Sequence, residues 1–258
     1  MIYELHQPEI ANLLFAGWDE SLIWSCLQNV MGKIYANSEE NPKSALAVLG
    51  DFCYFAGEPN KELIMYERLF LEKDFMIMVP GSESWAALIE KCYKEKSKRV
   101  TRYAIKKEKD IFDREKLQEA VKHVPEGYTL QMIDEKLFDY CMKTDWCRDF
   151  VAQYPDYSMF QKHGLGAVIL KGGELVSGAS SYSGYLNGIE IEVDTKEQYR
   201  RKGLAYICSA KLILECLNRD WYPSWDAQNK WSVALAEKLG YHFSHEYPAY
   251  EVTASNHR

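Results

Sequence analysis

The clearest indication of the fold is the stretch GIEIEVDTKEQYRRKGLAYICSAKLILECL, residues 188–217. It begins with strict alternation, which puts Ile189, Ile191 and Val193 on one face of a strand and acidic side chains on the other. A basic loop containing a glycine follows, and then residues 204–218 have the apolar spacing of an amphipathic helix. Because backbone N–H groups at such a helix start lack partners and the helix dipole is positive there, this arrangement favours a phosphate or pyrophosphate ligand.

The flanking sequence predicts a layered fold with two parts. A strand from Tyr128, a helix capped by Asp134, and further strands joined at the turn Gly172-Gly173 precede the decisive stretch. The first half also alternates strands and helices, and its first 35 residues have helical apolar spacing. We therefore expect an α+β fold built of α/β layers, with an N-terminal α/β domain over residues 1–125 and a second domain over residues 126–258.

Composition excludes several classes of protein. The 258 residues include 31 basic and 38 acidic side chains, a net charge of −7. This balance argues against a general nucleic-acid binder and slightly favours a cationic substrate. The seven cysteines form no Cys-x-x-Cys pair, as is usual for thiols kept reduced in a cytosol. With neither a signal peptide nor an apolar run of roughly 20 residues, we expect a cytoplasmic protein that does not bind a membrane.

A second motif follows the helix and identifies a family. YPSWDAQNKWSVALAEKLGYHF, residues 222–243, reads as a strand and then a helix that opens at Asn229 and ends in Lys238-Leu239-Gly240-Tyr241. Together with Arg200-Arg201-Lys202-Gly203-Leu204-Ala205, it resembles the two cofactor elements of the GNAT superfamily of acetyl-CoA-dependent N-acetyltransferases. The resemblance covers about 120 residues, from the strand after residue 126 to Val252. It implies a C-terminal GNAT fold, a mixed central sheet flanked by helices. The similar order of elements in the first half suggests a degraded copy of that fold.

The resemblance also implies a site for acetyl-CoA, with CoA as product. The strand would pair its backbone near Val193 with the pantetheine arm, and the loop would surround the pyrophosphate through its N–H groups. Gly203 would permit close backbone approach there. Asn229 would contact the cofactor, cap its own helix, or do both. The expected cofactor-binding residues are Val193, Arg200, Arg201, Lys202, Gly203, Leu204, Ala205, Asn229 and Ser232.

Acetyl transfer requires a base for the substrate ammonium, and the acidic strand supplies two candidates, Glu190 and Glu192. Which of the two is the base is left open, and each could instead be a solvated strand residue or an anchor for substrate charge. Many GNAT enzymes carry a tyrosine that protonates the departing thiolate, but this chain has Ala236 at the matching position. Tyr241, Tyr182, Ser232 or water are the alternatives. Cys208 and Cys216 fit packing thiols, and no metal site is expected.

The expected activity is transfer of an acetyl group to a primary amine of a small molecule. Within the family, residues 177–195, 199–205 and 222–229 resemble the branch related to zwittermicin A resistance acetyltransferases, and the resemblance extends into residues 50–59. Two other readings stay open, an enzyme that acetylates a protein or peptide amine and a non-catalytic CoA-binding regulator. The sequence also leaves a homodimer open.

Overall fold

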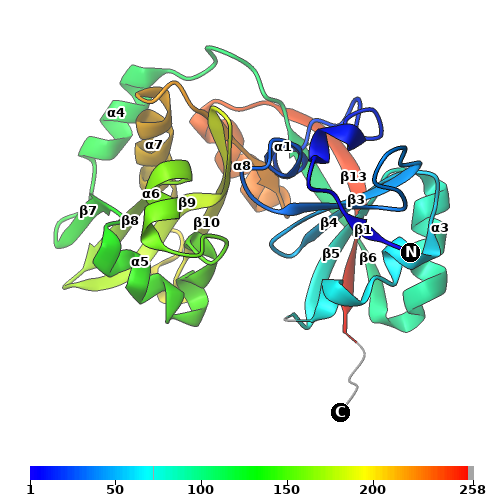
Figure 1. Ribbon diagram of the computed structural model, residues 1–258. Coiled ribbons are helices and arrows are strands. Elements are labelled where there is room, and N and C mark those ends of the chain that lie inside the picture. The colour runs from blue at the N-terminus through cyan, green and yellow to red at the C-terminus, as the bar shows by residue number, and fades with distance from the viewer. Residues whose placement is uncertain (72, 255–258) are drawn as a thin grey trace. The chain divides into compact units, whose positions relative to one another are not determined.

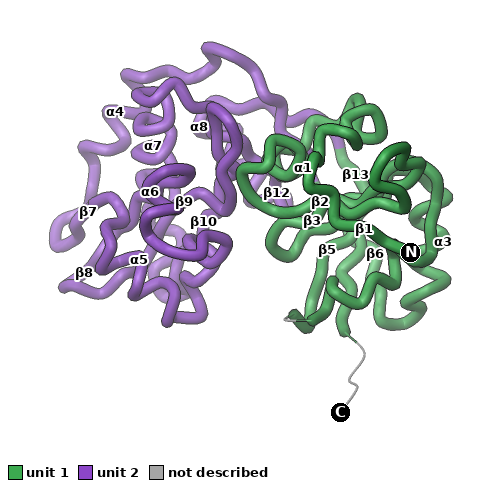
Figure 2. Tube along the Cα trace, in the orientation of Figure 1, with its two compact units in different colours: residues 1–102, 246–258 green, residues 103–245 purple. Residues whose placement is uncertain are grey.

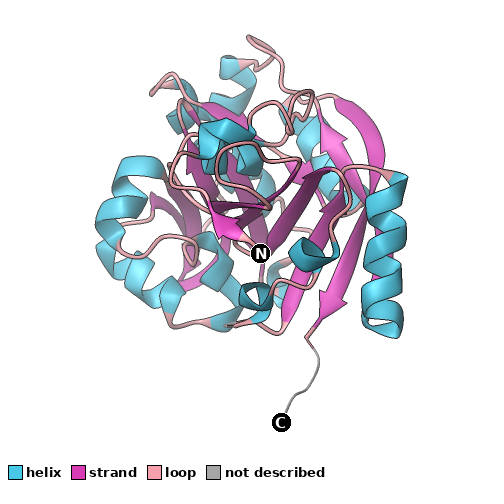
Figure 3. Ribbon diagram, turned by 45° about the vertical axis from the view of Figure 1, so that its right-hand side comes forward, coloured by secondary structure: helices cyan, strands magenta, loops and turns pink. Residues whose placement is uncertain are grey.

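The computed structural model describes residues 1–71 and 73–254, which form two compact units. Unit 1 consists of residues 1–102 and 246–258, and unit 2 of residues 103–245 (Figures 1 and 2). Each unit contains a β-sheet with helices packed on it, so the mixed α/β fold class expected from the sequence is confirmed (Figure 3). Within the described residues, no helix combines the length and the apolar character needed to span a bilayer.

Unit 1 contains a sheet with the strand order β1-β2-β3-β4-β5-β13-β6. These strands are β1 (Tyr3–Glu4), β2 (Lys33–Ala36), β3 (Ser44–Leu49), β4 (Phe52–Gly57), β5 (Phe75–Pro80), β6 (Ser97–Ile105) and β13 (Phe243–Thr253), of which the last two extend into unit 2. Its helices are α1 (Ser21–Leu27), α2 (Lys61–Ile64) and α3 (Glu83–Tyr93). Trp85 of α3 is fully buried in the core of this unit, where its indole N–H donates to the Gly57 carbonyl at 2.9 Å.

Unit 2 contains a five-stranded sheet with the order β11-β10-β9-β8-β7. Its strands are β7 (Tyr128–Met132), β8 (Gly166–Lys171), β9 (Glu174–Tyr185), β10 (Gly188–Thr195) and β11 (Tyr222–Ser224), and β12 (Asp226–Ala227) pairs with the end of β6. Its helices are α4 (Arg114–Lys122), α5 (Glu135–Met142), α6 (Tyr157–His163), α7 (Leu204–Leu217) and α8 (Lys230–Leu239).

The two sheets repeat one topology. β1 to β4 and β7 to β10 each run antiparallel to their neighbours, and in both units the fifth strand joins parallel to the fourth. A parallel pair requires a crossover connection. In unit 2 this connection carries the long helix α7, whereas in unit 1 the described part of the connection carries the four-residue helix α2. Unit 1 therefore has the strand pattern of unit 2 without the long helix that follows the basic loop.

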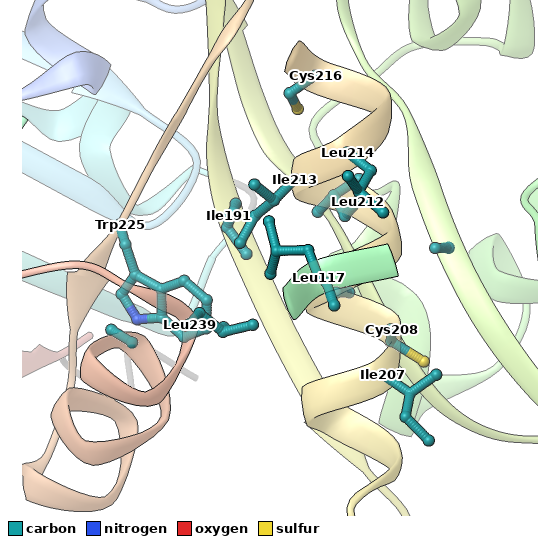
Figure 4. Close-up of a cluster of buried hydrophobic side chains, with 14 of the residues drawn as sticks. Leu117, Ile191, Ile207, Cys208, Leu212, Ile213, Leu214, Cys216, Trp225 and Leu239 are labelled. Atoms are coloured by element: carbon teal, nitrogen blue, oxygen red, sulfur yellow. The ribbon is translucent and has the colours of Figure 1, made fainter. Parts of the chain in front are cut away.

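The core of unit 2 forms around α7. Ile189 and Ile191 of β10 belong to the same cluster as Leu212 and Ile213 of α7, as the alternation of β10 predicts. Figure 4 shows Ile191, Leu212 and Ile213 within this cluster. Leu117 of α4 is fully buried in this cluster. Because α4 packs on α7, residues 103–125 belong to unit 2, and the compact units do not follow the boundary expected between residues 125 and 126.

The first 35 residues differ from the helical prediction. They form a short 3-10 turn at Pro8–Ala11, the seven-residue helix α1 and the start of β2. Gly17 has a positive φ of 84°, which breaks the helical path, and Leu13 lies on the surface despite its place in the apolar spacing. The apolar residues that recur at three- and four-residue steps here therefore belong to separate short elements and not to one continuous helix.

Candidate active site

The edge of β10 is the first element of the candidate site. β10 pairs with β9 along its length, but among the described strands it pairs with β11 over Gly188–Glu190 alone. The two parallel strands separate after Glu190. The backbone of β10 beyond that point borders a cavity, whose lining includes Val193, Asp194 and Thr195.

The basic loop is the second element, and its conformation is unusual. Arg201 and Gly203 have φ values of 61° and 77°, in the left-handed region. Arg200 turns back onto the strand, where its Nε donates to the Thr195 carbonyl at 3.0 Å and its guanidinium pairs with Asp194 at 3.6 Å. α7 then begins at Leu204, and its first helical bond runs from Ile207 N to Gly203 O at 3.2 Å. The N–H groups just before Ile207 have no helical acceptor and are available to an anion.

The backbone conformation at position 203 explains why this residue is a glycine. A Cβ built there meets no protein atom within 4 Å, but a φ of 77° strains any residue with a side chain. The protein itself therefore requires glycine at this position for its φ value, before any ligand approaches.

The start of α8 is the third element. Asn229 caps the helix, with its Oδ1 accepting from Ser232 N at 3.0 Å, so the predicted N-cap role is confirmed. Ser232 Oγ in turn accepts a hydrogen bond from Trp225 Nε1 at 2.9 Å. Trp225 is 3% exposed and packs edge-on against Tyr241, so one buried indole anchors the serine hydroxyl.

These elements enclose a cavity of about 470 Å³ between α7 and α8, here named the α7–α8 cavity. It is lined by Val193, Asp194, Thr195, Tyr199, Arg200, Arg201, Gly203, Leu204, Ala205, Tyr206, Trp225, Asn229, Trp231, Ser232, Leu235 and Lys238. The structure thus brings together every predicted cofactor-binding residue except Lys202, which lines a neighbouring cavity of about 490 Å³ with Gly203 and Tyr206. Orphan N–H groups beside cationic side chains suit a diphosphate, so the residues present fit CoA.

From the sequence, Trp225 and Trp231 either pack or line the acceptor pocket, and packing is the favoured interpretation. The structure places Trp231 in the outer wall of the α7–α8 cavity, and sequence reasoning missed the other residues of that wall. Trp231, Leu235 and Lys238 occupy positions i, i+4 and i+7 of α8, and Tyr206 lies across from them on α7. The helical spacing was visible in the sequence. That this face lines a cavity depends on where α8 packs.

Neither candidate base is among the residues that line this cavity, although Glu192 directly precedes Val193, which does. Glu190 is 7% exposed and shares a cross-strand row with Ser183 of β9 and Ser224 of β11. Its charge adds to the burial that raises the pKa of Tyr185, whose hydroxyl is 2.9 Å from Ser224 Oγ. Glu192 is half-buried, and the register of β10 against β9 shifts between Glu190 and Ile191. Glu190 therefore lies in a buried polar row, and Glu192 is closer to solvent.

The hydroxyl groups proposed to replace the missing tyrosine differ in their surroundings. Ala236 is fully buried in the core and carries only a methyl group, so its side chain offers no acidic proton. The hydroxyl of Tyr241 donates to the Pro223 carbonyl at 2.6 Å, and burial raises its pKa well above the ordinary value. Tyr182 is buried, and neither tyrosine lines the α7–α8 cavity. Ser232 lines it, and its hydroxyl hydrogen is not used in the bond with Trp225.

Two cysteines of α7 are packing residues, as predicted. Cys208 and Cys216 are fully buried in the core cluster. Burial raises the pKa of Cys208 to about 12, and it raises that of Cys216 as well. Neither thiol is activated as a nucleophile.

Comparisons with known proteins agree with this geometry. The model of a family described as GNAT acetyltransferase matches residues 12–250. A Bacillus subtilis (strain 168) protein described as uncharacterized N-acetyltransferase YdfB is 28% identical over 244 residues, which are 89% of each chain. A crystal structure of a GCN5-related N-acetyltransferase-like protein from Streptococcus suis 89/1591 is 45% identical, with a TM-score of 0.90 over 95% of this chain and 98% of that one.

A more distant structure resembles the whole chain in fold. A tandem GNAT protein from the clavulanic acid biosynthesis pathway covers 100% of both chains, with a TM-score of 0.53 and 10% sequence identity. At that identity the likeness concerns the fold alone. It agrees with the repeated strand topology of the two units.

Proposed function

This chain belongs to the GNAT acetyltransferase family, and on that premise we propose that it transfers the acetyl group of acetyl-CoA to a primary amine of a small molecule. The family makes it an acyltransferase. One observation carries the cofactor assignment: β10 leaves β11 after Glu190 and opens the α7–α8 cavity at the start of α7. Backbone N–H groups of residues 201–205 would hold the pyrophosphate, and the free edge near Val193 would hold the pantetheine amides.

The chain's own residues then handle the protons. Bound acetyl-CoA supplies an activated acyl group. A substrate ammonium must lose a proton before it can attack, and a carboxylate oxygen of Glu190 or Glu192 would accept that proton directly or through water. The buried polar row around Glu190 favours it as the base, because its carboxylate is held beside Ser183 and Ser224 and is 7% exposed, whereas Glu192 is closer to solvent. When the CoA thiolate leaves, the hydroxyl of Ser232, which lines the cavity, would donate a hydrogen bond to the departing sulfur.

Charge supports the choice of acceptor. A net charge of −7 raises the local concentration of cationic amines. The resemblance to the branch of zwittermicin A resistance acetyltransferases also favours a small-molecule acceptor. Two alternatives follow from specific features. The related enzymes that act on a protein or peptide amine share the same cofactor chemistry, and Ala236 at the acid position motivates a non-catalytic CoA-binding regulator.

Calorimetry with acetyl-CoA tests the cofactor assignment. Gly203→Glu places a carboxylate where the pyrophosphate would lie, and we expect it to raise the Kd by roughly 100-fold through charge repulsion and loss of space. Gly173→Glu is the matched control. Gly173 has a φ of 86°, its added side chain meets open space, and it lies in the turn between β8 and β9. A wild type that does not bind acetyl-CoA, or two variants with equal Kd values, would reject the assignment.

A panel of amines then tests the reaction. We expect wild-type turnover with at least one small primary amine, a loss of kcat of roughly 100-fold or more in Glu190→Gln, and a smaller loss in Glu192→Gln. Raising the pH should partly rescue a variant that has lost its base, because more of the amine is then already deprotonated. Cofactor binding without turnover across the panel would support the regulator, and turnover with peptides alone would support a protein acceptor.

A further inference from the structure

The outward face of α8 has a composition that its own packing does not explain. Trp231 is 84% exposed, although tryptophan has the largest apolar surface of any side chain. It shares one helical face with Leu235 and Lys238, and all three line the α7–α8 cavity. An indole held at the rim of a cavity offers a flat face to a ligand at little cost in conformational entropy.

Tyr206, on the α7 side of the cavity, holds the ammonium group of Lys238 in place. Lys238 Nζ lies 4.4 Å from the ring centroid of Tyr206, a cation–π contact that holds the ammonium group at the rim. This contact also occupies one face of the Tyr206 ring. Trp225, the other tryptophan lining the cavity, is buried and bonded to Ser232. Of the two tryptophans that line the described cavity, Trp231 is therefore the one whose ring face is accessible to a ligand.

The lining of the cavity combines two chemically different parts with the N-terminus of α7. One part is the free strand edge at Val193–Thr195, which suits a chain of amides. The other part combines the Trp231 face with the Lys238 ammonium, and this part is here called the aromatic and cationic end. CoA is asymmetric in the same sense, because its pyrophosphate joins an amide-bearing arm to an adenosine that carries a 3′-phosphate. The aromatic and cationic end matches the nucleotide.

We propose that Trp231 and Lys238 form the nucleotide subsite of the cofactor site, with Trp231 stacked on the adenine and Lys238 paired with the 3′-phosphate. This inference rests on the proposed function. It makes α8 the element that selects CoA thioesters over shorter thioesters with the same pantetheine arm. Stacking on an aromatic side chain contributes substantially to binding of any base, and a cation beside it adds selectivity for a ligand that carries the phosphate.

Calorimetry with CoA, dephospho-CoA and pantetheine tests this subsite without depending on turnover. We expect Trp231→Ala to raise the Kd of both nucleotides by roughly 5- to 100-fold and to leave pantetheine binding unchanged. Trp231→Phe should recover part of the loss, because it keeps an aromatic face. Lys238→Gln should raise the Kd of CoA about 2- to 5-fold and leave that of dephospho-CoA unchanged.

Control variants separate this effect from general damage. Glu237→Gln changes a charge on the exposed part of α8 outside the cavity lining, and Trp221→Ala removes a tryptophan that lines a different cavity. Both should bind CoA as the wild type does. If the wild type binds CoA tightly and Trp231→Ala binds it equally well, the subsite is wrong and the proposed function stands. If the wild type binds none of the three compounds, the proposed function fails and the subsite fails with it.

Discussion

Asn229 combines two tasks in a single side chain. Its Oδ1 caps α8 by accepting from Ser232 N, and the residue also lines the α7–α8 cavity. Gly203 has a comparable double position, since its φ permits the turn into α7 while the residue also lines the cavity. At both helix starts, the residue that shapes the backbone borders the proposed ligand.

The two tasks of Asn229 can be separated by substitution. Asn229→Ala removes the cap, and we expect it to lower the free energy of unfolding by about 1 kcal/mol. Asn229→Asp keeps a capping oxygen and should unfold like the wild type, but its negative charge beside the cavity should weaken acetyl-CoA binding. Urea unfolding and calorimetry measure the two effects. Equal binding by Asn229→Asp and wild type would restrict Asn229 to its capping role.

Buried thiols give the protein an alkaline limit to its stability. Burial raises the pKa of Cys26 and of Cys208 to about 12, from an ordinary value near 9. The folded protein therefore keeps protons that the unfolded chain releases above about pH 9. The contribution of these thiols to stability is complete below that pH and is lost progressively as the pH rises toward 12.

Denaturation in urea at about pH 8 and about pH 10 measures this loss. For the two thiols together, we expect the free energy of unfolding to fall by about 2–3 kcal/mol between these conditions. The double variant Cys26→Ala/Cys208→Ala is less stable at neutral pH but should lack this part of the pH dependence. An identical fall in wild type and variant would assign the alkaline loss to other groups.

Close approach between elements depends on glycines in β9. A Cβ at Gly184 would lie 1.9 Å from the carbonyl oxygen of His163, the last residue of α6, and a Cβ at Gly178 would lie 2.5 Å from a ring carbon of Phe150. The first neighbour is backbone and the second is a side chain. Without these glycines, α6 and the segment at Phe150 could not pack as closely on the sheet.

The two contacts predict different responses to alanine. Gly184→Ala should lower the free energy of unfolding by about 1–3 kcal/mol, and no side-chain change relieves a clash with a backbone carbonyl. Gly178→Ala should be partly rescued by Phe150→Leu, which removes the ring edge that the new methyl group meets. Thermal unfolding of the single and double variants measures both effects. A fully stable Gly184→Ala would contradict the close approach of α6 to β9.

The end of the chain completes the sheet of unit 1. β13 pairs antiparallel with β5, with Tyr250 opposite Met78 and Val252 opposite Met76. Tyr250 and Val252 are buried in the core of this unit, and the Tyr250 hydroxyl donates to Glu90 of α3. Unit 1 is therefore built from two segments far apart in the sequence, residues 1–102 and 246–258, and its sheet and core include β13.

Removal of residues 246–258 should prevent unit 1 from reaching its native fold, because β5 and β6 lose the strand between them. We expect limited proteolysis to cut the truncated chain rapidly within residues 1–102, whereas the full-length protein resists. Val252→Asp, which buries a charge in the same core, should have the same effect. Equal resistance of the truncated and full-length chains would show that unit 1 folds without β13.

Local chemistry along the chain accounts for much of this protein. The helix caps at Asp134 and Asn229 depend on residues three positions away, and each is observed where the sequence predicts it. The strand–loop–helix unit of residues 188–217 likewise forms where alternation, a loop glycine and an apolar helical segment predict it. The helix itself is not amphipathic as predicted, because α7 is buried on most of its faces. These features involve short-range contacts, so neighbouring residues are sufficient to specify them.

Other features depend on which distant segments meet. The return of β13 to β5, the packing of α4 on α7 and the cavity lined by Trp231 and Lys238 join residues far apart in sequence. A strand's own residues specify its faces but not its partner, since backbone hydrogen bonds are the same for every neighbour. The short elements before residue 36 are a further case, because their apolar side chains meet different parts of the core. Tertiary packing, through burial of those side chains, decided these contacts.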